Sequence, residues 1–123
     1  SYVMFKYCSV EELKGKVLTR IDVTDDRIDF YTQDNLHYIM HHIQDCCENV
    51  YIEDIDGDIQ GMVGEQIVLA ETVDNVDREL VNDYHESYTW TYYKFATRNG
   101  YVTIRWYGES NGYYSEYVDF FIS

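Results

Sequence analysis

The sequence has 123 residues, of which 46% are hydrophobic and 17% aromatic, and its formal net charge at pH 7 is −14. This length and apolar content are those of one folded domain rather than a disordered chain, so we predict a single domain over residues 1–123. The strong negative charge argues against direct binding to nucleic acid or to an anionic membrane surface, since both repel an acidic protein.

The first predicted element is a short helix over 9–15. Ser9 and Glu12 have the spacing of a capping box, and Gly15 is typical of a helix end. Segments 16–23, 26–32 and 36–42 follow, and each is rich in β-branched and aromatic residues. The short polar turns between these segments predict an antiparallel meander.

The middle of the chain predicts strands at 50–54 and 65–73. In 74–86, Val76, Leu80 and Tyr84 recur at four-residue spacing, which predicts a short helix or an ordered loop. The last third predicts strands at 86–97, 100–108 and 113–122, joined by tight turns. Alternation in the second of these separates two faces, Val102, Ile104 and Trp106 on one and Tyr101, Thr103, Arg105 and Tyr107 on the other.

These elements together predict a mainly-β α+β fold. We expect a twisted antiparallel sheet, with a C-terminal three-stranded meander and one or two short helices that cover a face.

Charge is distributed unevenly along the chain. From Asp22 to Glu86 there are 18 acidic residues and two basic ones, whereas the two flanks together hold five acidic and seven basic residues. Fixed carboxylates on strands and loops produce a field that attracts a basic surface. The predicted partner-binding residues are Glu53, Asp54, Asp56, Asp58, Asp74, Asp77 and Glu79.

Segment 41–50, HHIQDCCENV, concentrates chemically active side chains. His42 and Cys46 are four residues apart, a spacing that aligns two ligands on a helix, so His42, Cys46 and Cys47 are candidate metal ligands. A nucleophilic cysteine is another alternative, although the acidic surroundings raise a thiol pKa. The simplest interpretation is a corner of the fold with buried cysteines, and the cysteine content predicts free thiols in a reducing compartment.

The segment DIDGDIQGMVGE resembles a calcium-binding loop in its carboxylates. Asp54, Asp56, Asp58 and Glu65 occupy positions one, three, five and twelve of such a loop, but Ile59 stands where the loop needs glycine. The flanking residues are typical of strands instead of helices. We therefore interpret this segment as a solvated acidic loop.

Three stretches, QDCCENVYIEDIDGD, ESYTWTYYKFAT and GYVTIRWYGESNGYYSEYV, resemble an uncharacterised domain family of bacteriophages and bacteria. The resemblance extends from about Gly15 to Phe120. It implies a mobile-element setting, in which small acidic proteins often block host defence enzymes, and it supplies no catalytic residues that could be transferred to this chain.

The leading functional prediction is a non-enzymatic, phage-type inhibitor. It would act as a DNA mimic on a basic surface of a host nucleic-acid enzyme, such as a CRISPR effector or a restriction enzyme, in the host cytoplasm and without a cofactor. No apolar run approaches the ~20 residues of a membrane span, and the N-terminal residues lack a signal-peptide pattern. Alternatives are a metal- or small-ligand-binding module at the histidine and cysteine segment, a thiol enzyme, and a charge that serves solubility alone.

Overall fold

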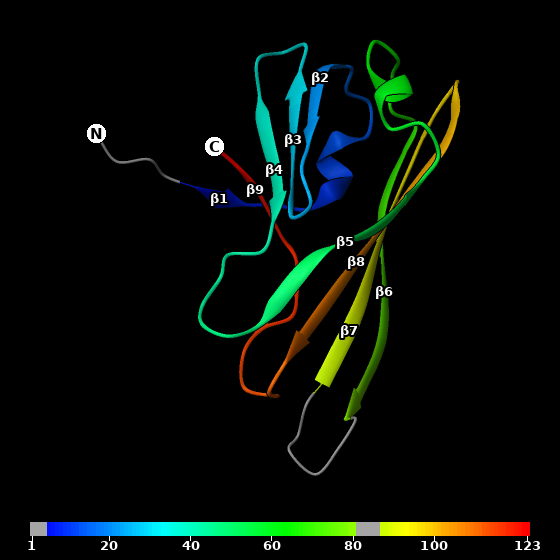
Figure 1. The fold of residues 1–123 in the computed structure, drawn as a ribbon. Coiled ribbons are helices and arrows are strands. Elements are labelled where there is room, and N and C mark those ends of the chain that lie inside the picture. Colours follow the sequence, from blue (N-terminus) through cyan, green and yellow to red (C-terminus); the bar gives the residue numbers. More distant parts are fainter. Residues whose placement is uncertain (1–4, 81–86) are drawn as a thin grey trace.

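The computed structural model describes residues 5–80 and 87–123, with side chains for all of these except 74–80. The described chain forms two antiparallel sheets that pack face to face (Figure 1). The strands of the first sheet, in spatial order, are β1 (Lys6–Tyr7), β9 (Asp119–Ile122), β4 (His37–His41), β3 (Arg27–Thr32) and β2 (Leu18–Val23). Those of the second are β5 (Asn49–Asp56), β8 (Gly100–Ser110), β7 (Ser87–Thr97) and β6 (Leu69–Leu80).

The core lies between the two sheets, because each sheet buries the apolar side chains of one face. Phe30 of β3 meets Phe95 of β7 with ring centroids 5.8 Å apart. Trp106 of β8 is buried and its Nε1 donates to Sδ of Met40 in β4 at 3.2 Å. The two predicted faces of 100–108 are confirmed, since Val102, Ile104 and Trp106 are buried while the alternating residues are not.

The mainly-β prediction is confirmed, but the α+β class is not. The described residues contain no α-helix, only the 3-10 helices η1 (Val10–Leu13) and η2 (Gln60–Met62). Ser9 caps η1 as predicted, although its Oγ accepts the N–H of Glu11 instead of that of Glu12, and Gly15 ends the turn with φ +90°. One turn is too short to form a helical layer.

The predicted C-terminal meander is wrong at its third strand. β7 and β8 form the expected hairpin, but β9 pairs with β4 and β1 in the opposite sheet. Phe120 and Phe121 are consecutive and both buried, which requires cover on both faces of the strand. Phe120 stacks on Tyr38, with centroids 5.6 Å apart, and Phe121 packs against Phe5 and Tyr7. A third strand at the sheet edge would leave one of the two phenylalanines in water.

Residues 74–80 are part of strand β6, so the predicted helix or loop is wrong there. The backbone pairs with β7, with a shift of register between Asn75 and Glu79. Pairing along a long neighbouring strand outweighs a weak helical periodicity. The remaining part of the predicted segment, 81–86, lies outside the described residues. No helix in the described part of the chain is both long and apolar enough to cross a membrane.

Candidate functional site

Aromatic side chains form a row across the outward face of the β5-β8-β7-β6 sheet. In the strand register Tyr107 of β8 lies between Tyr51 of β5 and Trp90 of β7. Trp90 stacks on Tyr107 with centroids 5.5 Å apart, Tyr51 lies 5.6 Å from Tyr107, and Tyr88 packs edge-on against Trp90 at 4.9 Å. We call Tyr51, Tyr88, Trp90 and Tyr107 the aromatic row. Because the rings pack on one another, the row is ordered before any partner arrives.

Carboxylates border the aromatic row along β5. Asp54 lies opposite Arg105, and a bulge in β5 adds Glu53 beside it. Glu53 is neutralised, because its Oε1 accepts from Nε of Arg105 at 2.8 Å. Asp54 and Asp56 are exposed, and neither makes an ion pair with a described side chain.

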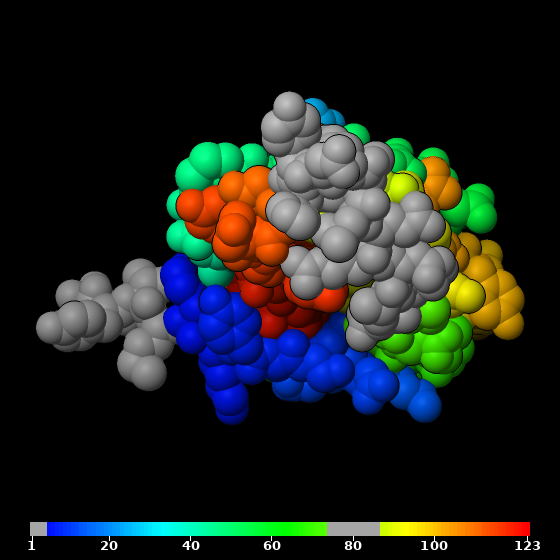
Figure 2. Space-filling model, turned by 90° about the horizontal axis from the view of Figure 1, so that it is seen from below, coloured from blue at the N-terminus to red at the C-terminus, as the bar shows by residue number. Residues whose placement is uncertain are grey.

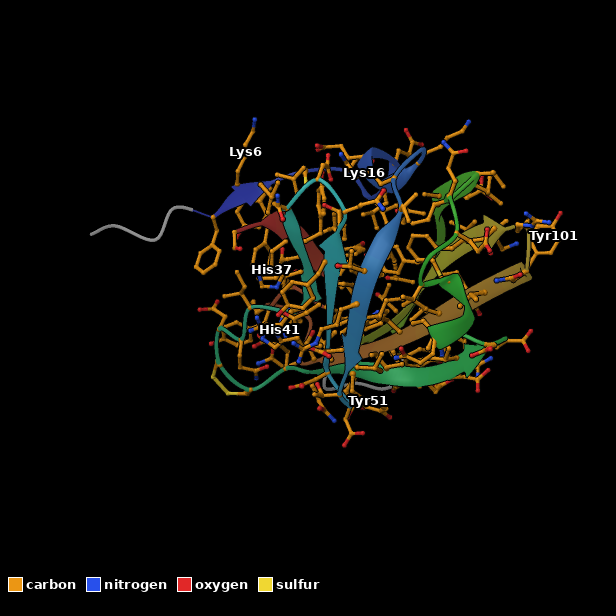
Figure 3. The ribbon with its side chains drawn as sticks, turned by 90° about the horizontal axis from the view of Figure 1, so that it is seen from above. Lys6, Lys16, His37, His41, Tyr51 and Tyr101 are labelled. Atoms are coloured by element: carbon orange, nitrogen blue, oxygen red, sulfur yellow. A yellow bond between two sulfur atoms is a disulfide. The ribbon has the colours of Figure 1, made fainter. Side chains whose placement is uncertain are left out.

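The turn between β2 and β3 brings two further carboxylates to the same edge. The backbone N–H of Ile52 donates to the carbonyl oxygen of Asp25 at 2.8 Å, so the turn abuts β5. A cavity of about 560 Å³ lies there, and its lining includes Asp25, Asp26 and Tyr51. Figure 3 shows Tyr51 on β5 beside the end of β2. We call Asp25, Asp26, Asp54 and Asp56 the acidic rim.

The seven predicted partner-binding residues do not form one cluster. Glu53, Asp54 and Asp56 lie on β5 and Asp58 follows it, all of them exposed. The other three, Asp74, Asp77 and Glu79, lie on β6, and their side chains are outside the described part of the molecule. β5 and β6 are opposite edges of the same sheet, with β8 and β7 between them.

Ion pairs weaken the field that the sequence predicts for the middle of the chain. Basic residues of the flanks make three ion pairs, and Arg27 of the middle segment makes a fourth. The four described pairs of arginine or lysine are Lys16–Asp34, Arg20–Asp22, Arg105–Glu53 and Arg27–Asp29. Asp29 is the most enclosed of these acids. Burial acts to raise its pKa, but hydrogen bonds from Arg27 and His37 outweigh burial and hold the pKa below its usual range. The acidic rim has no such compensation from described residues.

The structure does not support a calcium-binding loop over residues 54–65. Asp54 and Asp56 are part of an extended strand, and Asp58 comes after Gly57, which turns the chain with φ +102°. In the part of the chain that the structure describes, no three His, Cys, Asp or Glu side chains converge on a position where a metal ion could bind. The interpretation as a solvated acidic segment agrees with this geometry.

The histidine and cysteine segment connects β4 to β5, and its cysteines are not free. Cys46 and Cys47 are exposed and bonded to each other, so the prediction of free thiols is wrong for this pair. A strand would place the adjacent side chains of Cys46 and Cys47 on opposite faces, but the segment is a tight turn and the two sulfur atoms are bonded. Oε1 of Glu48 accepts the backbone N–H groups of Asp45 at 2.7 Å and Cys46 at 2.9 Å and so closes the turn.

The His42 side chain points into the fold, whereas Cys46 and Cys47 are exposed, so the three residues do not form a set of metal ligands. It is buried, its Nδ1 donates to the carbonyl oxygen of Tyr117 at 2.8 Å, and its Nε2 lies 3.6 Å from Oε1 of Glu48. Burial acts to raise the pKa of Glu48, but the N–H groups of Cys46 and Asp45 and the His42 ring hold it below its usual value. His42 and Glu48 therefore fix the predicted corner of the fold, but the prediction that its cysteines are buried is wrong, since Cys46 and Cys47 are exposed.

Thiol catalysis has no support in the described chain. The third cysteine, Cys8, is free, but burial, followed by the nearby Glu12 carboxylate, raises the pKa of its thiol to about 11. A thiol with that pKa is almost entirely protonated at neutral pH, and the thiolate is the nucleophile.

We expect one reactive thiol in protein that is prepared without reductant and unfolded in the presence of iodoacetamide, and three after reduction. Mass spectrometry of the alkylated protein measures both values. As a control, the Cys46→Ser/Cys47→Ser variant should carry one alkyl group in both conditions. Three alkyl groups without reduction would contradict the bond between Cys46 and Cys47.

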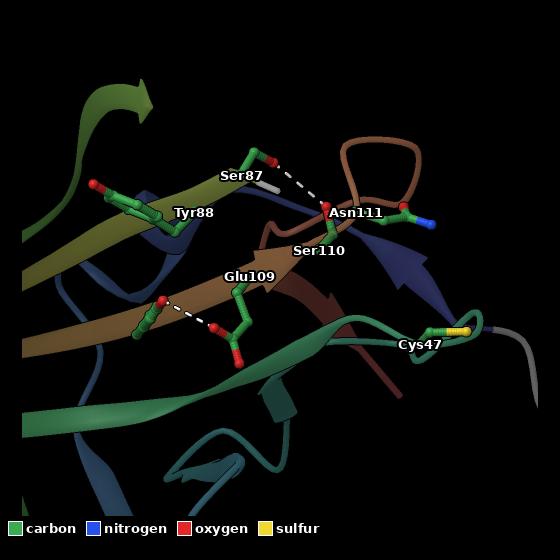
Figure 4. Close-up of a pocket in the computed structure, with 7 residues that line it drawn as sticks. Cys47, Ser87, Tyr88, Glu109, Ser110 and Asn111 are labelled. Carbon is green, nitrogen blue, oxygen red and sulfur yellow. Dashed lines mark hydrogen bonds between the residues drawn. The ribbon is translucent and has the colours of Figure 1, made fainter. Parts of the chain in front are cut away.

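A cavity of about 500 Å³ opens at the end of the aromatic row, beside Tyr88, Tyr107 and Glu109 (Figure 4). All three stretches that carry the family resemblance meet here, because the lining includes Cys47 from the turn, Ser87 from the start of β7 and Ser110 from the end of β8. Figure 2 shows the turn and the end of β8 side by side when the molecule is seen from below.

Glu116 lies behind the wall of this cavity and holds the 111–118 loop on the sheet. It is buried; its Oε2 accepts from the hydroxyls of Ser87 and Ser110, and its Oε1 accepts from Thr89 at 2.8 Å. Gly108 makes the close approach possible, since a Cβ there would lie 2.4 Å from the carbonyl oxygen of Glu116. Sequence reasoning missed Glu116, because an isolated glutamate between serine and tyrosine resembles any surface residue.

Comparison with protein families gives one match, to the model of a domain of unknown function, DUF7448, over residues 11–120. No curated protein and no solved structure matches the chain significantly. The match confirms the predicted likeness to an uncharacterised domain family. The family description assigns no function.

Proposed function

The chain belongs to the DUF7448 family, and we propose that this member binds a basic surface of a protein partner and catalyses no reaction. The observation that carries the proposal is the position of the aromatic row beside the acidic rim, at one edge of the outward sheet face. Tyrosine and tryptophan provide contact area at a low cost in side-chain entropy, and unpaired carboxylates steer and select a positively charged partner.

The arrangement also supports strong binding per unit of area. Rings that already pack on one another lose little freedom when a partner covers them. Tryptophan and tyrosine are enriched among the residues that dominate binding energies, and their faces attract arginine and lysine by cation–π interaction. The row and the rim therefore favour the same kind of partner, one that presents basic side chains.

The partner class that we propose is a host nucleic-acid enzyme, such as a CRISPR effector or a restriction enzyme. Such an enzyme binds duplex DNA, which carries one charge per ~1.7 Å of axis, through arrays of lysine and arginine. Asp54 and Asp56 are two positions apart on β5, a repeat of about 6.6 Å along a strand, and Asp25 and Asp26 extend the charged edge. A protein bound in this way competes with DNA for the groove.

The proposal is tested with an arginine–glycine repeat peptide as the basic probe and calorimetry as the measurement. We expect binding at low ionic strength that weakens with salt, because the screening length falls from ~10 Å at 0.1 M to ~3 Å at 1 M. The Asp54→Lys/Asp56→Lys variant should bind about tenfold more weakly.

The matched control is Glu11→Lys/Glu12→Lys, which makes the same change in net charge on η1, outside the rim. It should retain most of the affinity. Equal losses in the two variants would mean that the peptide responds only to net charge, and the acidic rim would then have no special role.

A further inference from the structure

Among the described residues that line the cavity at the end of the aromatic row, the charged side chain is acidic. Its volume is about 500 Å³, and none of the described residues that line it is basic. Glu109 supplies a carboxylate, and the rings of Tyr88 and Tyr107 supply aromatic surface. A cation is therefore the charge type that the cavity fits.

Ser87, Ser110 and Asn111 supply the uncharged polar side chains of the wall. The hydroxyls of Ser87 and Ser110 both donate to Glu116 behind the wall, and both residues are buried. Ser110 also accepts the backbone N–H of Gly112 at 3.0 Å, and its Oγ lies 3.5 Å from that of Ser87. The charged group of the wall is therefore Glu109, whose carboxylate accepts hydrogen bonds and donates none.

The Glu109 carboxylate is held in place by Tyr107. The Tyr107 hydroxyl donates to Oε2 of Glu109 at 3.0 Å, and the amide of Asn49 lies 3.5 Å from Oε1. Burial, together with the Glu109 carboxylate, raises the pKa of Tyr107 to about 12, so the phenol keeps its proton and continues to donate at neutral pH. The carboxylate is thus oriented, and it retains lone pairs for a further donor.

The two rings complete the site. Tyr88 and Tyr107 have centroids 6.3 Å apart and planes at 85°, so a planar group can lie on the face of one ring and meet the edge of the other. Guanidinium is planar, stacks on aromatic rings, and carries five N–H donors and no acceptor. An ammonium group is a compact point charge with three donors and uses such a site less fully.

We propose that this cavity binds the guanidinium group of an arginine side chain presented by the basic partner, with Glu109 as counter-ion and Tyr88 and Tyr107 as aromatic walls. The inference rests on the proposed function, because the arginine comes from the partner that the aromatic row and the acidic rim bind. It adds a selectivity for arginine over lysine that charge alone does not produce.

The test compares the arginine–glycine peptide with a lysine–glycine peptide of equal length and charge. Wild-type protein should bind the arginine peptide about five- to tenfold more tightly, from one bidentate contact and one stacked cation. Glu109→Gln and Tyr88→Leu should each reduce this ratio to about one. Glu11→Gln, which removes the same charge elsewhere, should leave the ratio unchanged.

The ratio separates this inference from the proposed function. The Asp54→Lys/Asp56→Lys variant should weaken both peptides equally and preserve the ratio. If both peptides bind wild-type protein with equal affinity, or if the preference persists in Glu109→Gln and Tyr88→Leu, the arginine site is overturned while the basic-partner proposal stands. If neither peptide binds, the proposed function fails and the arginine site fails with it.

Discussion

The Tyr107→Ala protein is expected to bind the arginine–glycine peptide about 30- to 100-fold more weakly than wild type, a loss of about 2–3 kcal/mol. Tyr107 is the centre of the aromatic row, where it contacts the rings of Tyr51, Tyr88 and Trp90. Its removal deletes contact area, and it also removes the surface on which Tyr51 and Trp90 are ordered. The loss therefore exceeds that of one ring at the rim of an interface.

Tyr101→Ala is the matched control for this prediction. Tyr101 lies on the same strand and the same face, is 77% exposed and makes no ring contact with a described residue. Its removal should change the affinity by less than about twofold. Thermal unfolding of both variants shows whether the fold is retained. Equal affinities of the two variants would mean that the aromatic row does not form the binding surface.

Much of the aromatic row could be derived from the sequence. The turn at Arg98 and Asn99 pairs Thr97 with Gly100, and that register brings Trp90 opposite Tyr107. Alternation then places both rings on the outward face. The contribution of β5 could not be derived in this way, because its pairing with β8 joins residues some fifty positions apart and no local pattern specifies it.

The long-range placement of β9 was likewise beyond local pattern. Alternation in 113–122 is compatible with a third strand beside β8, and the competing arrangement depends on cover for Phe120 and Phe121 from distant segments. The acidic rim shows the same limit for charge. The sequence predicts an excess of carboxylates, but only the folded chain shows that Glu53 is paired with Arg105 and that Asp54 is not.

The Glu116→Leu protein is expected to have a free energy of unfolding about 3 kcal/mol lower than that of wild type. Leucine fills much of the same space but accepts no hydrogen bond, so the hydroxyls of Ser87, Thr89 and Ser110 lose their acceptor inside the protein. A buried polar group without a partner costs about 1–3 kcal/mol. The apolar contacts of leucine offset part of that total.

Urea unfolding measures the free energy of unfolding, and two further variants serve as comparisons. Glu116→Gln keeps a carbonyl oxygen as acceptor and should lose less than half as much stability as Glu116→Leu. Glu11→Ala removes an exposed glutamate and should change the free energy by less than about 0.5 kcal/mol. Because the 111–118 loop crosses Gly108 at Glu116, loosening it should also disturb the serine wall of the cavity and lower the preference for arginine over lysine. Wild-type stability in Glu116→Leu would mean that the three hydroxyls find other partners and that Glu116 does not hold the loop.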